Sequence, residues 1–366
     1  MRESTQSLFP NFYKNMKILY QIPSLDTIYA GRTIYAGYKN AFEDMGHEFL
    51  PFTADDDFEQ LCKSFNPDIF ITGLSSYYIK YLNLDYLQKR KQHFKNFKVF
   101  INIPYWVSPI AKYRVNETPW LGGNTEFIHL LKGPYFDICF NSCEQWDERM
   151  TGFEEGIWKL YYTLPLAADK TLMKPDFDTE FEADISFIGT NLPQKREYFR
   201  EWLFPLRKQF QLRLYGQDWS SGDRMLGHVQ RIGQYFNIPY VRSIRKPKLW
   251  LGDEAKIYSS TKISVNLHED YQRKFGWDCN ERTFKILACG GFEITDDLTC
   301  IRKYFEDGKE IVMAKDKDDW FEKIAYYMKH PEECKTISEA GKKKVLTEHT
   351  YHNRVQRIID IYHWII

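Results

Sequence analysis

The sequence predicts an α/β protein with two domains, each built on a parallel β-sheet. Short apolar segments that suit buried strands alternate with longer segments that suit helices, and several strands run into a glycine or a polar residue. The alternation restarts after residues 164–175, a segment with prolines near both ends. A chain of 366 residues is too long for one ordinary core and fits two domains of roughly 150–200 residues. Such alternation favours parallel sheets covered on both faces.

The first half is expected to hold five strands and three helices. Residues 104–125, rich in Pro, Trp and Gly, are expected to be irregular. The strands are predicted at 17–22, 49–52, 69–73, 98–103 and 136–141. The helices are predicted near 33–45, 57–65 and 86–97, the last with a basic, solvent-exposed face.

The second half repeats the pattern and closes with helices. Strands are predicted at 184–188, 211–215, 262–267, 292–296 and 311–314. Helices are predicted near 195–209, 254–260, 317–329, 331–346 and 350–364, with a short apolar helix inside residues 280–290. The predicted divisions are an N-terminal extension (1–15), a first domain (16–165), a linker (166–182), a second domain (183–348) and a C-terminal helix (349–366).

Charge and cysteine content narrow the class of protein. The chain has 50 basic and 50 acidic residues, so it offers no bulk attraction to nucleic acid, and we expect none as a partner. It has no run of about 18 apolar residues and no signal-peptide core, so we expect a cytoplasmic protein without stable membrane insertion. The seven cysteines are scattered, and Cys139 and Cys143 lack partners for a metal site, so reduced thiols are expected.

Open parallel sheets bind ligands beyond the carboxyl ends of their strands, which selects candidate residues from position alone. After the first strand this rule selects Asp26, Gly31 and Arg32, and after the strand at 98–103 it selects Tyr105 and Trp106. If the halves face each other, one cleft brings both sets together. The candidates of the second half are Gly189, Thr190, Gly216, Trp219, Asn266, His268, Asn280, Glu281, Arg282 and Thr283.

Several candidates also have an ordinary structural reading. The glycines could be plain turn residues, His268 could be a satisfied structural group, and Asp26 could cap a helix instead of acting as a general base. Lys195 and Arg196 begin a helix and could be solvated, although Arg196 could also pair with a diphosphate. Aromatic residues make up 17% of the chain, either as core or, for some Tyr and Trp, as the wall of a sugar-binding cleft.

The segment Asn280–Asp296 carries the most information about function. A helix that opens with Asn, Glu, Arg and Thr presents free backbone N–H groups and the positive end of its dipole, which suits a phosphate or a ribose hydroxyl. Gly290 and Gly291 then allow a sharp turn into the next strand. The chain has no Walker loop, HExxH, nucleophile elbow or zinc pattern, and no GxGxxG follows a strand, so NAD chemistry is not expected.

Several segments share the pattern of one family of enzymes. "MGHEFLPF", "FNPDIFIT" and "LPLAADKTLMKP" match it loosely in the first half and the linker. The stronger matches are "DISFIGT" (184–190), "LYGQDW" (214–219), "KISVNL" (262–267), "ERTFKILACGGF" (281–292), "YFEDGKEI" (304–311) and the tail from 330 to 354. Through these segments the chain resembles the glycosyltransferases of GT-B fold, most closely the CgeB-like (spore maturation protein) glycosyltransferase family.

The resemblance implies two Rossmann-like domains that face each other across a cleft, with a C-terminal helix that crosses back to the first domain. It also implies a nucleoside diphosphate sugar held mainly by the second domain. No metal or other cofactor is implied, because helix N-termini and basic side chains stabilise the leaving diphosphate in such enzymes. By position, Gly189 and Gly216 would approach the nucleotide, and residues 280–283 would lie at the diphosphate and ribose.

Lys285 departs from the family pattern. Many relatives have a glutamate at this position, and that glutamate commonly holds the ribose. A lysine cannot accept hydrogen bonds. Either Glu281, one helical turn earlier on the same face, takes over this role, or the nucleotide is recognised differently.

On these grounds we expect a glycosyltransferase of the hexosyltransferase type, which moves a sugar from a nucleoside diphosphate sugar to a hydroxyl of a glycan, a small molecule or a protein. Asp26 and Arg282 are the expected catalytic residues, and Tyr105 and Trp106 are the acceptor-side candidates. A sugar-nucleotide epimerase and a non-catalytic binding protein remain alternatives, and the oligomeric state is open. The donor-binding candidates are Gly31, Arg32, Gly189, Thr190, Arg196, Gly216, Trp219, Asn266, His268, Asn280, Glu281, Thr283 and Lys285.

Overall fold

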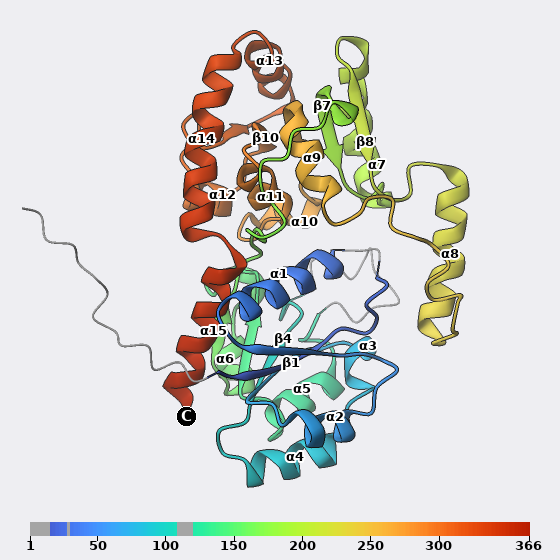
Figure 1. Ribbon diagram of the computed structural model, residues 1–366, viewed down its shortest axis with the longest axis vertical. Helices are drawn as coiled ribbons and strands as arrows, with labels where there is room; N and C mark the ends of the chain where they lie inside the picture. Colours follow the sequence, from blue (N-terminus) through green and yellow to red (C-terminus); the bar gives the residue numbers. More distant parts are fainter. Residues whose placement is uncertain (1–14, 28–29, 108–119) are drawn as a thin grey trace, which may run out of the picture.

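The computed structural model describes residues 15–27, 30–107 and 120–366, which form two α/β domains stacked one above the other (Figure 1). The first domain holds a six-stranded sheet in the order β2-β1-β3-β4-β5-β6, and the second a five-stranded sheet in the order β11-β10-β9-β7-β8. All neighbouring strands in both sheets are parallel. The predicted fold class is therefore confirmed. The N-terminal extension, residues 1–14, lies outside the described residues.

Among the described residues, the first domain contains all but four of its strands and α-helices at or near the predicted positions. Its strands are β1 (Lys17–Gln21), β2 (Glu48–Phe52), β3 (Ile69–Gly73), β4 (Lys98–Asn102), β5 (Ile138–Asn141) and β6 (Tyr161–Thr163). Its helices are α1 (Gly31–Asp44), α2 (Phe58–Phe65), the short α3 (Ser76–Ile79), α4 (Leu84–His93), α5 (Thr125–Lys132) and α6 (Phe153–Ile157).

The helices α3, α5 and α6 and the strand β6 were not predicted. The side-chain oxygen of Asn124 accepts a hydrogen bond from the Phe127 N–H at 3.0 Å and caps α5, a start signal that the sequence contains. The strand β6 is only three residues long, too short for a recognisable alternation. The helix α4 ends at His93 rather than at 97. Residues 104–125 were expected to be irregular, and within them residues 108–119 lie outside the described part of the chain.

The second domain follows the predicted order of strands, with different helices near its start. Its strands are β7 (Ala183–Ile188), β8 (Leu212–Tyr215), β9 (Thr261–Asn266), β10 (Glu293–Asp296) and β11 (Val312–Ala314). Its helices are α7 (Arg196–Tyr198), α8 (Ser221–Tyr235), α9 (Asp253–Ser260), α10 (Asp270–Phe275), α11 (Arg282–Ala288), α12 (Thr299–Tyr304), α13 (Lys317–Tyr327) and α14 (Pro331–Glu348), followed by α15 (Tyr351–Ile365).

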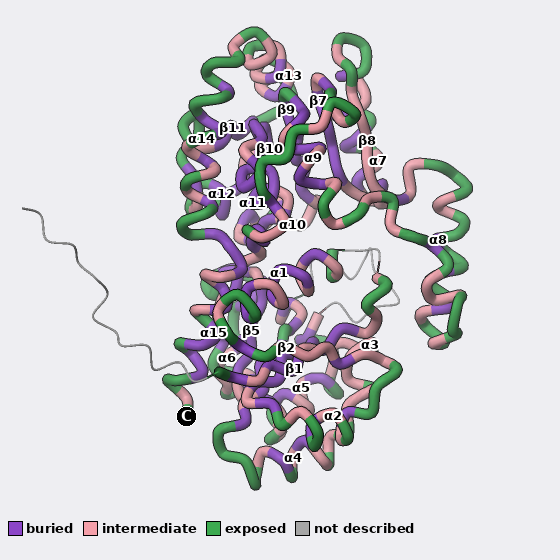
Figure 2. The backbone as a smooth tube through the Cα atoms, viewed as in Figure 1, coloured by how far each residue is buried: buried purple, intermediate pink, exposed green. Residues whose placement is uncertain are grey.

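The helix predicted near 195–209 is instead a series of short helical turns, in which α7 is followed by a π-turn at Phe199–Leu203 and a 3₁₀ segment at Phe204–Lys208. Pro205 has no backbone N–H and interrupts a regular α-helix here. The helix α8 was not predicted, since its three glycines lower helix propensity. It projects from the second domain, and Figure 2 shows much of it exposed.

Both sheets have the same winding order. In each, the first strand of the domain lies between the second and the third, so the chain changes direction beside β1 and β3 in one sheet and beside β7 and β9 in the other. Doubly wound sheets of this order bind ligands at such a switch point, beyond the carboxyl ends of the strands. Residues that follow the strands contact the opposite domain: Tyr105, which follows β4, donates a hydrogen bond to Asp278 of the second domain. The two ligand-binding edges therefore face each other.

The C-terminal helix α15 crosses from the second domain to the first, as expected (Figure 1). Val355, Ile358 and Ile359 of α15 are buried in one apolar cluster with Ile18 of β1 and Phe42 of α1. The start of α15 is fixed by a capping box between Thr350 and Asn353. The crossing helix thus contributes to the core of the first domain.

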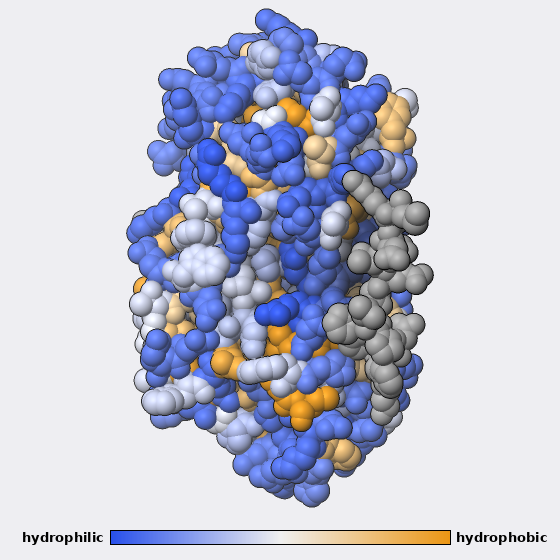
Figure 3. Space-filling view, turned by 90° about the vertical axis from the view of Figure 1, so that its left-hand side faces the viewer, coloured by the Kyte–Doolittle hydropathy of each residue, from blue (hydrophilic) through white to orange (hydrophobic). Residues whose placement is uncertain are grey.

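The cysteines lie in the interior, and the surface over α14 and α15 is largely polar. All seven cysteines are buried and free. The face that carries α14 and α15 is mostly hydrophilic, with apolar side chains gathered in its lower part over the first domain (Figure 3). Within the described residues, no helix is long and apolar enough to span a bilayer.

We expect Gly37→Ala to destabilise the protein, because α1 approaches α15 most closely at this glycine. A Cβ at residue 37 would lie 2.1 Å from the Tyr351 ring. Overpacking of this kind costs about 1–3 kcal/mol of unfolding free energy, measurable by urea denaturation. Gly222→Ala in α8 is the control: no atom lies within 4 Å of its added Cβ, so it should not destabilise. Equal stability of the two variants would contradict the close helix packing.

Candidate functional site

Arg282 joins the two strands at the switch point of the second sheet. It is the first residue of α11, and its guanidinium donates from Nη1 to the carbonyl of Ile188, the last residue of β7, and from Nη2 to the carbonyl of Leu267, just after β9, each at 3.0 Å. Its Nε donates to Asn266 Oδ1, also at 3.0 Å. Burial lowers the pKa of Arg282. A rigid, half-buried cation therefore lies where the fold places ligands.

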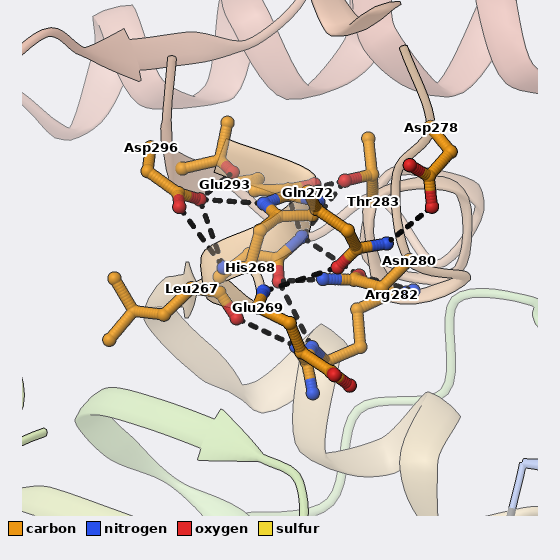
Figure 4. Close-up of polar contacts among 12 residues, drawn as sticks. Leu267, His268, Glu269, Gln272, Asp278, Asn280, Arg282, Thr283, Glu293 and Asp296 are labelled. Atoms are coloured by element: carbon orange, nitrogen blue, oxygen red, sulfur yellow. Dashed lines mark hydrogen bonds and ion pairs between the residues drawn. The ribbon is translucent and has the colours of Figure 1, made fainter. Parts of the chain in front are cut away.

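Asn266, the last residue of β9, connects Arg282 to a group of buried polar side chains. Figure 4 shows Arg282 together with Thr283 and Glu293 of this group. Its Nδ2 donates to Thr283 Oγ1 at 2.8 Å and to Glu293 Oε1 at 2.9 Å. Asn280 exchanges hydrogen bonds with Asn266, and its Oδ1 also accepts from the Arg282 N–H at 3.0 Å. The structure thus brings four predicted residues together: Asn266, Asn280, Arg282 and Thr283.

Glu293, which starts β10, is a member of this group that the sequence prediction missed. Burial raises its pKa to about 8, and the hydrogen bonds from Asn266 and Thr283 offset only part of that rise. The Glu293 carboxyl is therefore mostly protonated at neutral pH and supports the site as an uncharged group. A glutamate inside a predicted strand carried no sequence signal for this role.

The sequence allowed either a structural or a functional role for His268, and its contacts fit the structural role. The side chain is fully buried, and its Nδ1 lies 2.6 Å from Asp296 Oδ1. The backbone N–H of His268 also donates to the Asp296 carboxylate. Burial opposes ionisation of Asp296, but these contacts outweigh it and hold its pKa below the usual range. The pair anchors the loop after β9.

Lys195 is buried, so the prediction that it is solvated is wrong. Its Nζ donates to the Leu267 carbonyl at 3.0 Å, beside the Arg282 contact to the same oxygen. Burial, reinforced by the nearby Arg282 charge, lowers the pKa of Lys195 to about 7. Arg196, the neighbouring candidate, is half-buried, and its Nε finds no hydrogen-bond partner among the described residues. The donor side therefore gathers basic groups, and the carboxylates of Glu269 and Asp296 are close enough to act on the charges of Lys195 and Arg282.

Gly189 and Gly216 lie in the two loops that lead out of β7 and β8. A Cβ at residue 189 would lie 2.6 Å from Arg282 Nη1, and one at residue 216 would lie 2.4 Å from the Gly189 carbonyl oxygen. Gly216 also has φ of +112°, which favours glycine. Trp219 Nε1 donates to the Gly189 carbonyl at 3.0 Å. These glycines let the loops pack against Arg282, with the half-buried Thr190 following Gly189.

Glu281 and Lys285 form a buried contact between the domains. Lys285 Nζ lies 2.5 Å from Glu254 and 3.2 Å from Glu281, and although burial lowers its pKa, these carboxylates outweigh that effect and raise it. Glu281 also accepts from Thr33 of α1 at 2.6 Å and from Tyr351 of α15 at 2.8 Å. Each Glu281 oxygen therefore already accepts a hydrogen bond inside the protein, which favours the second possibility left by the sequence, that the nucleotide is recognised differently.

The candidates of the first domain do not form a single cluster. Asp26 is exposed on the loop after β1, and Arg32 reaches the second domain, where its Nη1 donates to the Leu249 carbonyl at 3.1 Å. Tyr105 is buried, with its hydroxyl 3.1 Å from Asp278 Oδ2. Trp106 packs against the first-domain core at Phe153.

A cavity of about 490 Å³ opens at the switch point of the first sheet. Its walls include Gln21 at the end of β1, Thr72 in β3 and Asn102 at the end of β4, and Tyr271 of α10 contributes from the second domain. Gly31 and Tyr105 line it, whereas Asp26, Arg32 and Trp106 do not. The residues described include no group of three or more His, Cys, Asp or Glu side chains that could hold a metal ion.

We expect Glu293→Gln to stabilise the protein progressively as the pH rises. The folded-state pKa of about 8 exceeds the unfolded value, so the wild-type Glu293 contribution is present at low pH and is lost as the pH rises toward 8. The difference in unfolding free energy between variant and wild type should grow by at most about 1.4 kcal/mol per pH unit between pH 5 and 8. The exposed Glu339→Gln should show no such trend. A constant difference for Glu293→Gln would mean that Glu293 is ionised.

Comparison with known proteins finds a family model and a curated relative that match this chain. Residues 195–360 match the family model described as "Glycosyl transferase-like". The spore protein CgeB of Bacillus subtilis (strain 168) is 24% identical over 253 residues, which cover 63% of this chain and 74% of CgeB.

Solved structures show the same fold at low sequence identity. A sucrose-phosphate synthase of Thermosynechococcus elongatus superposes with a TM-score of 0.62 and 13% identity, covering 96% of this chain and 99% of its own. An α-glucosyltransferase in complex with UDP and a 13-mer DNA gives 0.64 at 13% identity, covering 96% and 100%. The resemblance to CgeB-like glycosyltransferases is confirmed: the chain has the GT-B fold, its residues 195–360 match the glycosyl transferase-like family model, and CgeB is a relative in sequence.

Proposed function

We propose that this protein transfers a sugar from a nucleoside diphosphate sugar to an acceptor hydroxyl, with the donor on the second domain and the acceptor on the first. The observation that carries the proposal is the position of Arg282. It lies at the β7–β9 switch point, beside Lys195, and both basic groups are on the domain edge that faces the 490 Å³ cavity. A diphosphate would give Arg282 and Lys195 a direct ion-pair partner, which neither has among the described residues, where both donate to uncharged oxygens.

In the proposed reaction, the bond between the anomeric carbon and the diphosphate oxygen breaks, and its electron pair leaves with the diphosphate. The acceptor oxygen forms a new bond to the same carbon and gives up its proton to a base. Asp26 is the candidate that the sequence offers for this base, although it lies on the loop after β1 and not in the cavity lining. Arg282, Lys195 and the N-terminus of α11 offset the charge of the departing diphosphate, so we propose that no metal is needed.

UDP is the first nucleotide to test, because the α-glucosyltransferase of the same fold was solved with UDP. That enzyme also carries DNA in some structures, but the net charge of zero gives this chain no general attraction to DNA. The ion pairs of Lys285 with Glu254 and Glu281 give that unusual lysine a structural role. Its presence therefore does not by itself favour a non-catalytic protein.

We expect one nucleoside diphosphate among UDP, GDP, dTDP and ADP to raise the melting temperature, with and without magnesium, whereas CMP should not. At a ligand concentration of 100 Kd the stabilisation should be about 2.7 kcal/mol. Arg282→Ala should abolish the shift and lower turnover by orders of magnitude, because three of its hydrogen bonds and the charge are lost. The control is Arg302→Ala in α12, whose guanidinium is exposed and pairs with Asp297. If none of these nucleotides shifts the wild-type protein, the donor site is refuted.

Lys195 should make nucleotide binding depend on pH. With a pKa of about 7 in the free protein, its amine loses its charge as the pH rises above 7, and a bound diphosphate should restore that charge. We therefore expect proton uptake on UDP binding at pH 7.5–8 and weaker affinity at higher pH. Calorimetry in two buffers of different ionisation enthalpy measures the uptake.

Lys195→Met should remove most of this proton uptake and weaken binding. Lys262→Met is the matched control, since Lys262 is exposed at the opposite end of β9 and pairs with Asp184. Equal proton uptake by the wild type and by Lys195→Met would exclude Lys195 from the diphosphate site.

A further inference from the structure

The first-domain cavity differs in chemical character from the basic edge it faces. None of the described residues that line it is Asp, Glu, Lys, Arg or His, although 27% of the chain is Asp, Glu, Lys or Arg. Its walls combine tyrosine rings, such as Tyr20, Tyr38 and Tyr78, with amide and hydroxyl side chains, such as Asn102 and Ser75. The described part of this cavity therefore carries no formal charge from an acid or a base.

The tyrosines add no charge either. Burial raises the pKa of Tyr38 and Tyr78 to about 12 and that of Tyr20 well above the usual value. Each of these rings therefore keeps a neutral hydroxyl at physiological pH. Such a group can both donate and accept a hydrogen bond while its ring offers apolar surface.

Part of the polar wall is already satisfied and part is available. Thr72 Oγ1 donates to Gln21 Oε1 at 2.5 Å, and Gln21 Nε2 donates to the Tyr78 carbonyl at 2.9 Å, which fixes the floor between β1 and β3. By contrast, the Ser75 side chain makes no capping hydrogen bond to α3, and the exposed Asn102 amide has no partner among the described residues. These two side chains can hydrogen-bond a ligand.

We propose that this cavity binds an uncharged saccharide as the acceptor, an inference that rests on the proposed transferase function. A phosphate or carboxylate buried here would have no cation to compensate it. A purely apolar acceptor would leave the Ser75 and Asn102 side chains and the strand ends unpaired. A neutral sugar satisfies both conditions, because its hydroxyls pair with the amides and hydroxyls while its C–H faces contact the tyrosine rings. The volume of about 490 Å³ lies in the usual range for small-ligand pockets.

The test uses matched acceptors that differ only in charge. Neutral mono- and disaccharides built from glucose, galactose, mannose or N-acetylglucosamine are compared with the corresponding 6-phosphates and uronic acids. The readout is nucleotide release from the donor sugar above the rate with donor alone. We expect at least one neutral sugar to accelerate release and its charged counterpart to be at least about tenfold less effective in kcat/KM.

A cation placed in the cavity should reverse this selectivity. Asn102→Lys should shift the ratio of kcat/KM toward the phosphorylated sugar by about tenfold or more, because it supplies the missing countercharge. Gln92→Lys, on the exposed surface of α4, adds the same charge away from the cavity and should leave the ratio unchanged. Saturation-transfer NMR with the neutral sugar and its 6-phosphate reports binding without relying on activity.

The outcomes separate the two proposals. A faster reaction with the phosphorylated or uronic acid form, no response to any neutral sugar, or transfer only to a peptide or to DNA would overturn the neutral-saccharide proposal while leaving the transferase function intact. Failure of every nucleoside diphosphate to bind, with saccharide binding still seen by NMR, would instead refute the transferase function and retain the saccharide site.

Discussion

The guanidinium of Arg282 holds together the edge of the second sheet on which the donor side depends. Its contacts to the carbonyls of Ile188 and Leu267 connect the two strands at the switch point, and its Nε fixes Asn266. Gly189 must be a glycine because this guanidinium occupies the space of a side chain. One cation thus fixes the loops around it, and its charge lies at the edge of the second sheet that faces the first domain.

The two domains meet through polar contacts that are buried on both sides. Glu281 accepts from Thr33 in the first domain and from Tyr351 of the crossing helix, while Lys285 pairs with it from the next helical turn. Since α15 belongs to the core of the first domain, the start of α11 is held by both domains at once. The basic donor edge and the neutral cavity are therefore kept at a defined separation by side chains that themselves take no part in the proposed chemistry.

Much of the fold was predictable from the sequence, because the long apolar strands and the helices between them have clear periodicity. Three differences between the predicted and the observed elements have clear physical causes. The strand β6 is too short to show a pattern, Pro205 interrupts the helix expected at 195–209, and the glycines of α8 lower its helix propensity. In the site, strand-end positions correctly selected Arg282, Asn266, Asn280 and Thr283 as neighbours. Burial decided the rest, since only the folded chain shows that Lys195 is enclosed and that Glu293 is protonated.

The buried triad of Glu254, Glu281 and Lys285 also constrains how this chain can vary. A glutamate at position 285 would bury three carboxylates together here unless a second position changed with it. Thr33 and Tyr351 both donate hydrogen bonds to Glu281, so a change at position 281 would also affect α1 and α15. Positions 254, 281 and 285 should therefore vary as one unit, and chains with lysine at 285 should form a distinct group that keeps an acidic residue at the other two.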